Sequence, residues 1–136
     1  LRKLKLVVTE RSNGHKPSDD CDVYIVNTYG EMSKFLRLSN VTFIGGSIVN
    51  HGGQNPLEAV RMGNYVMHGK KVNNFKEIYK ELKSLKISSE IKNIDQMEKV
   101  FVKNHNYKIS NSKLNKINYL GAKIFENNVK EIKNYL

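Results

Sequence analysis

Short apolar runs alternate with amphipathic segments along most of the chain. The apolar, β-branched stretches at residues 4–9, 22–27, 41–44 and 65–68 are each bounded by polar or turn-forming residues. This pattern predicts buried β-strands. A weaker run at residues 87–91 predicts a last strand at the edge of the sheet.

The segments between and after these runs carry apolar residues at helical spacing. They predict five helices, at about residues 31–39, 56–62, 74–85, 95–102 and 110–136. The second begins at Pro56 and ends before Gly63, the usual asymmetry of helix ends. Asp95 is the expected N-cap of the fourth helix.

Strands that alternate with helices predict a parallel sheet, because parallel strands need crossover connections and helices supply them. We therefore expect an α/β fold, a doubly wound parallel sheet with helices on both faces, in a single domain over residues 1–136. Such sheets bind ligands at the carboxyl ends of their strands. A functional site is thus expected in the loops after Asn27, Ile44 and His68.

Composition restricts the cellular compartment, the bound metals and the partners that the chain can have. The single cysteine, Cys21, cannot form an internal disulfide, and the four histidines have no metal-ligand spacing, so we expect a reducing compartment and no bound metal. No apolar run approaches the roughly 20 residues that span a bilayer. Residues 70–136 hold 15 Lys and Arg against 7 Asp and Glu. That excess of positive charge would favour binding to nucleic acid or to an anionic membrane. It is equally consistent with lysines that are merely exposed to solvent.

The segment from Gly45 to Glu58 (GGSIVNHGGQNPLE) places four glycines between a predicted strand and a helix. Glycine lets a ligand approach the main chain, and a helix start offers free N–H groups to an anion. The segment therefore predicts a site for a phosphate-bearing ligand, although it matches neither generic nucleotide motif and a purely structural turn is the alternative. Glu58 would accept hydrogen bonds from ribose hydroxyls or merely complement the helix dipole, and Asn55 is a suitable N-cap.

Thr28 to Glu31 occupies the same position after the preceding strand, with Gly30 opening a helix and Glu31 in its first turn. Two neighbouring strand-end loops, each followed by a helix start, predict a convergent anion site.

The stretch from residue 22 to residue 75 resembles the Kdo (3-deoxy-D-manno-octulosonic acid) transferases. The family pattern is close to DVxLxDTMGEL, then FVGGSLVxxGGHNPLE, then GPxxxNF, and this chain reads DVYIVNTYGEM, FIGGSIVNHGGQNPLE and GKKVNNF. Three motifs in order with matching separations make the resemblance specific. The departures that change the chemical character of the side chain are Asn27 for Asp, Tyr29 for Met, Gln54 for His, Ala59 for the Pro that follows the second motif, and Lys70 for Pro.

The resemblance implies a glycosyltransferase with two Rossmann-like domains (the GT-B arrangement), of which this chain would be the C-terminal one. It implies CMP-Kdo as the donor substrate, with no cofactor and no bound metal. The donor contacts that it implies are Tyr29, Gly30, Glu31, Gly45, Gly46, Ser47, Asn55, Pro56, Leu57 and Glu58. Glu58 would bind the ribose hydroxyls, with Gly45 to Ser47 near the phosphate. No catalytic residue is expected, because the family's general base is a glutamate of the N-terminal domain.

The resemblance further implies that the chain lacks the first strand of its domain and the N-terminal acceptor domain, so that it would be soluble and inactive alone. The full enzyme would transfer Kdo to a lipid A precursor in lipopolysaccharide biosynthesis, at the cytoplasmic face of the bacterial inner membrane. An anionic membrane surface is a further expected partner of the basic half.

Two other functions remain open from the sequence. The first is a GT-B domain that uses a UDP- or GDP-sugar. The second is a basic, non-enzymatic module that binds nucleic acid or a membrane surface. We expect no nucleic acid partner, because the aromatic residues fall mostly at core-like positions.

Overall fold

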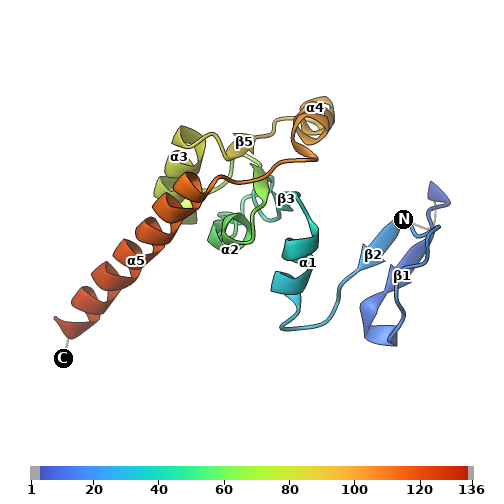
Figure 1. Cartoon of the computed structure of the whole chain (residues 1–136), viewed down its shortest axis with the longest axis horizontal. Helices are drawn as coiled ribbons and strands as arrows, with labels where there is room; N and C mark the ends of the chain where they lie inside the picture. Colours follow the sequence, from blue (N-terminus) through green and yellow to red (C-terminus); the bar gives the residue numbers. More distant parts are fainter. Residues whose placement is uncertain (1–3, 135–136) are drawn as a thin grey trace. The chain divides into compact units, whose positions relative to one another are not determined.

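The computed structural model describes residues 4–134. The chain forms two compact units, the first ending at Phe35 and the second beginning at Leu36, and each is described by itself. Helix α1 (Met32–Leu38) crosses the boundary between them. The predicted α/β class with parallel strands is confirmed, and the strands are distributed over two sheets, one in each unit (Figure 1).

The first unit contains two short parallel strands. β1 (Val8–Glu10) pairs with β2 (Val23–Ile25), Val8 lying opposite Val23. The loop expected after β1 contains a 3₁₀ helix, η2 (Arg11–Asn13). The expected strand start at Leu4 is wrong, because Lys5 has a φ of 56°, which a strand does not accommodate.

The second unit is built on three parallel strands with β4 in the centre. β3 (Val41–Ile44), β4 (Tyr65–His68) and β5 (Ser88–Glu90) are all parallel, so the weak run at residues 87–91 is confirmed as an edge strand. The helices of this unit are α2 (Leu57–Arg61), α3 (Lys76–Ser84), preceded by the 3₁₀ helix η3 (Asn73–Phe75), α4 (Ile94–Asn104) and α5 (Asn111–Lys133).

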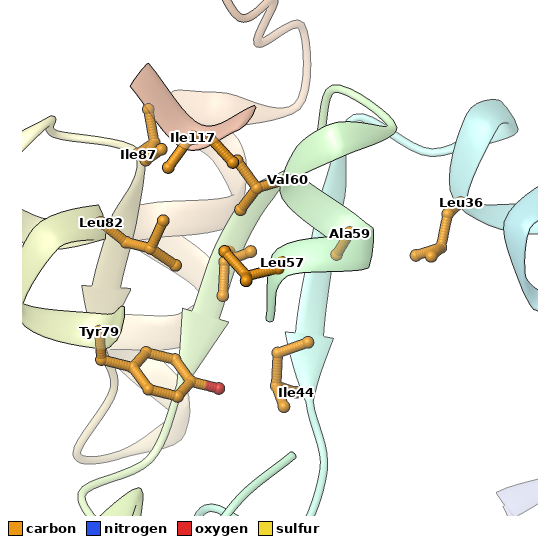
Figure 2. Close-up of a cluster of buried hydrophobic side chains, with 10 residues drawn as sticks. Leu36, Ile44, Leu57, Ala59, Val60, Tyr79, Leu82, Ile87 and Ile117 are labelled. Atoms are coloured by element: carbon orange, nitrogen blue, oxygen red, sulfur yellow. The ribbon is translucent and has the colours of Figure 1, made fainter. Parts of the chain in front are cut away.

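Helices cover both faces of this three-stranded sheet, as predicted. Alternate residues of β4 point to opposite faces. Val66 belongs to a buried cluster with side chains of α2, α3 and α5, in which Val60, Leu82 and Ile117 meet (Figure 2). Met67 lies in the other cluster, together with Tyr65 and Ile91 and against Met97 and Val100 of α4.

The helix ends differ in part from the predicted ones. Asp95 is not the N-cap of α4: the helix begins one residue earlier, and the side chain of Asn93 accepts a hydrogen bond from the amide of Gln96 at 2.9 Å. Asp95 instead lies in the first turn, where its charge complements the helix dipole. Ser110 caps α5, which ends at Lys133, and residues 135–136 of the predicted helix lie outside the described residues.

Candidate functional site

The ends of β3 and β4 are joined by the side chain of Ser47. The Ser47 hydroxyl, fully buried, donates to the carbonyl of Ile44 at 2.6 Å and accepts from the amide of Gly69 at 2.8 Å. A Cβ atom at residue 69 would overlap the backbone of Ser47, so this close approach requires glycine. The loops that follow the two strands therefore start from a common contact.

The glycine-rich loop after β3 is held by a hydrogen bond of its own backbone and by residues that follow β4. Three hydrogen bonds fix it: from the amide of Gly53 to Gly46 (3.1 Å), from the amide of Asn74 to Gly52 (3.3 Å) and from the Tyr79 hydroxyl to the carbonyl of Gln54 (3.1 Å). Burial raises the pKa of Tyr79 to about 12, so its phenol stays a donor at neutral pH. Hydrogen bonds within the protein thus hold the loop in place.

His68 ends β4 but takes no part in an open site. Its ring is buried against that of Tyr79, with centroids 4.3 Å apart, and its Nδ1 faces the carbonyl of Gly69 at 2.8 Å. Burial lowers the pKa of His68. A neutral ring that donates from Nδ1 accounts for this geometry and makes His68 a packing residue.

The predicted site residues of this loop divide into buried and exposed ones. The side chains of Ser47, Pro56 and Leu57 are buried, and Leu57 is part of the core cluster, so that any ligand contact from these three would come from the backbone. Asn55 is exposed and its side chain accepts from the amide of Leu57 at 3.0 Å, but the N-cap of α2 is Pro56 and not Asn55. Glu58 is exposed in the first turn of α2, and its carboxylate forms no salt bridge within residues 4–134.

In the first unit, Glu31 forms a charged cluster at the end of β2. It directly precedes α1 and accepts two hydrogen bonds from Arg11, at 3.1 and 3.0 Å, and one from the Thr28 hydroxyl at 2.6 Å. Lys34 lies 3.3 Å from the same carboxylate. Hydrogen bonds from Arg11, Thr28 and Lys34 lower the pKa of Glu31 to about 2. Because Arg11 and Glu31 lie 20 residues apart, spacing along the sequence gave no sign of this pair.

Asn27, one of the departures from the family pattern, connects the ends of β1 and β2. Its Oδ1 accepts from the amide of Ser12 at 2.9 Å, and its Nδ2 donates to the Ser12 hydroxyl at 2.8 Å and to Glu10 at 3.4 Å. The amide group therefore acts as donor and acceptor at once.

Tyr29 and Gly30 complete the loop after β2. Both are exposed, and Gly30 has a φ of 77°, which glycine adopts without strain. The predicted convergence of this loop with the glycine-rich loop joins residues of different units and stays a prediction. Within residues 4–134, no three His, Cys, Asp or Glu side chains are grouped to bind a metal ion. No helix in this part of the chain has the length and apolar character to span a bilayer.

The chain is similar to known proteins in sequence and in fold. No protein-family model matches it. It is 37% identical over 82 residues to a 3-deoxy-D-manno-octulosonic acid transferase of Haemophilus influenzae, covering 60% of this chain and 19% of that protein. It is 31% identical over 130 residues to a protein of the same name from Rickettsia bellii, covering 96% of this chain and 26% of that protein. The chain thus spans about a quarter or less of these relatives.

A solved structure has the same fold. The crystal structure of the C-terminal CMP-Kdo binding domain of WaaA from Acinetobacter baumannii superposes with a TM-score of 0.70 and 26% sequence identity, over 74% of this chain and 53% of that one. The chain is therefore a Rossmann-like α/β domain. Within that class it belongs to the Kdo transferase family, as part of the C-terminal domain.

Replacing the Ser47 hydroxyl tests its structural role. We expect Ser47→Ala to lower the free energy of unfolding by about 1–3 kcal/mol, because the buried amide of Gly69 loses its acceptor. Urea denaturation measures the change. Ser112→Ala on the exposed side of α5 is the matched control and should change stability by less than about 0.5 kcal/mol. Equal effects of the two substitutions would contradict the role given to Ser47.

The Glu31 cluster predicts a dependence on pH. The folded-state pKa, about 2, lies below the ordinary value of 4.5, so the stabilisation is complete above about pH 4.5 and is lost as the pH falls toward 2. The side-chain carboxyl ¹³C resonance of Glu31 reports this pKa directly. Arg11→Gln should return it toward 4.5, whereas Lys16→Gln, another exposed cation of this unit, should not. A Glu31 pKa that stays near 2 in Arg11→Gln would show that Arg11 is not the cause.

Proposed function

We propose that this chain is the donor-binding domain of a Kdo transferase and holds CMP-Kdo by its nucleotide. The match to a CMP-Kdo binding domain over 74% of the chain carries this proposal. The sequence relatives, which bear the name of Kdo transferases, support the same donor.

The geometry of the glycine-rich loop suits a phosphate and a ribose. Gly45 is exposed where the loop leaves β3, so that a phosphate can approach the main chain there. Glu58 offers an exposed carboxylate that forms no salt bridge among the described residues, and two ribose hydroxyls would hydrogen-bond to it. Because the loop is already ordered by hydrogen bonds, binding would cost little conformational entropy.

The loop after β2 would contribute in a different way. The Glu31 carboxylate is already occupied by Arg11, Thr28 and Lys34. We therefore assign it the task of fixing the position of the exposed Tyr29–Gly30 backbone, which would be the part that contacts the nucleotide.

The reaction of the whole enzyme rests on parts outside this chain. We propose that the intact protein transfers Kdo to a lipid A precursor, that the acceptor and the general base belong to an N-terminal domain, and that the enzyme works at the cytoplasmic face of the inner membrane. This chain would bind and orient the donor, which lowers the entropic part of the barrier without chemistry of its own.

Titration with nucleotides tests the donor site. We expect CMP to shift the backbone amides of Gly30, Gly45 and Glu58 in NMR spectra, and UMP and GMP to do so less. Glu58→Gln should weaken CMP binding by about 10- to 100-fold, the effect of losing hydrogen bonds to a charged acceptor. Glu98→Gln on the exposed side of α4 is the control.

The outcomes separate the alternatives. A preference for UDP or GDP over CMP would favour a different GT-B donor. Amides that stay unmoved at millimolar CMP, or equal weakening by Glu58→Gln and Glu98→Gln, would contradict the proposed site.

We also propose that α5 contacts an anionic membrane surface. Lys116, Lys123 and Lys130 are exposed and follow at intervals of seven residues, which places them on one side of the helix. None of them forms a salt bridge with any residue from 4 to 134. The C-terminal half of α5, to which Lys123 and Lys130 belong, extends beyond the sheet of its own unit (Figure 1).

Vesicle binding tests this surface. The chain should co-sediment with vesicles that contain phosphatidylserine, and each Lys→Gln substitution in this row should weaken binding by about fivefold, since a lysine near an anionic surface contributes about 1 kcal/mol. Binding should weaken with salt. Lys86→Gln, outside α5, should leave binding unchanged. Affinity for duplex DNA with none for vesicles would favour the nucleic-acid module instead.

A further inference from the structure

A second candidate site lies at the carboxyl ends of the three strands of the second unit. A pocket of about 590 Å³ opens there, within the size range of small-molecule sites. Its polar lining comes from Lys70, Glu90, Lys92 and Asn93, and Phe43 and Met97 belong to its apolar wall. None of the residues proposed above to hold the nucleotide lines it.

Strand pairing brings two lysines to this pocket. β4 and β5 pair in parallel with His68 opposite Glu90, so the residues two positions further along, Lys70 and Lys92, leave neighbouring strand ends in the same direction. Both lysines are exposed, and within residues 4–134 neither forms a salt bridge, even though Glu90 lines the same pocket. Two like charges without an anion between them repel each other, and a bound anion relieves that repulsion.

The start of α4 adds a third positive contribution. The helix has 11 residues and begins at Ile94, which lines the pocket with its N-cap Asn93. The Gln96 side chain accepts from the amide of Lys92 at 3.0 Å and so fixes the backbone beside the pocket. Asp95, the acid of the first turn, is not among the lining residues. The start of α4 therefore contributes partial positive charge at the pocket, which the first-turn carboxylate of Asp95 partly offsets.

Glu90 and the apolar wall restrict the chemical class of ligand that the pocket can bind. A carboxylate beside two lysines disfavours a polyanion, but it accepts hydrogen bonds from hydroxyl groups. Phe43 and Met97 offer apolar surface to the C–H face of a sugar ring. We propose that this pocket binds a sugar bearing one anionic group, a phosphate or a carboxylate, with Lys70 and Lys92 on the anion and Glu90 on the hydroxyls. The site is separate from the proposed nucleotide site.

Titration of the 136-residue chain tests this pocket, at constant ionic strength. Glucose 6-phosphate and glucuronate should each shift the amides of Lys70, Lys92 and Asn93 in NMR spectra, and their relative affinities tell the phosphate and carboxylate sources apart. Glucose should not bind, and inorganic phosphate should bind more weakly than glucose 6-phosphate. Lys70→Gln and Lys92→Gln should each weaken binding by about fivefold.

Two controls make the result decisive. Lys103→Gln, on α4 but outside the pocket, should leave the affinity unchanged, and saturating CMP should not displace the sugar anion. Glu90→Gln should reduce the preference for glucose 6-phosphate over inorganic phosphate. The proposal is overturned if no anionic sugar shifts these amides, if Lys103→Gln weakens binding as much as Lys70→Gln, if inorganic phosphate binds as tightly as the sugar phosphate, or if CMP competes.

Discussion

The buried hydroxyl of Ser47 is the contact on which the carboxyl end of the three-stranded sheet depends. It connects the last carbonyl of β3 with the first amide after β4, and the missing side chain of Gly69 allows the two loops to come that close. Ser47 is followed directly by Ile48, which lines the pocket at the carboxyl ends of the strands, and by the rest of the glycine-rich loop. Gly69 is followed directly by Lys70, which lines the same pocket. Both candidate sites of the second unit are thus positioned from one pair of hydrogen bonds.

Local sequence patterns predicted the centre of the fold well and its beginning poorly. Strands β3 and β4 have the predicted bounds, because an apolar, partly β-branched run followed directly by glycine leaves little choice of where a strand ends. The run at residues 4–9 looks similar, but Lys5 has a positive φ, which nothing in the sequence indicates. At α4, Asn93 and Asp95 are both good caps, and only the conformation of Ile94 decides between them.

The candidate site was predictable in position but not in orientation. The resemblance to a family identified the glycine-rich loop, yet it did not separate the exposed Glu58 from Ser47, Pro56 and Leu57, whose side chains face the interior. Contacts between residues that are far apart in the sequence were not predicted at all. The Arg11–Glu31 pair requires the ends of β1 and β2 to meet, and the pocket that Lys70 and Lys92 share follows only from the parallel pairing of β4 and β5.

The hydrogen bonds of the Asn27 side-chain amide restrict which residues can stand at positions 10 and 27. Its Nδ2 lies 3.4 Å from a carboxylate oxygen of Glu10, whereas the family pattern has aspartate at residue 27. An aspartate there would bring two negative charges together and lose the donor to Ser12. Positions 10 and 27 are therefore coupled: an aspartate at 27 is accommodated better beside a neutral or basic residue at 10 than beside Glu10.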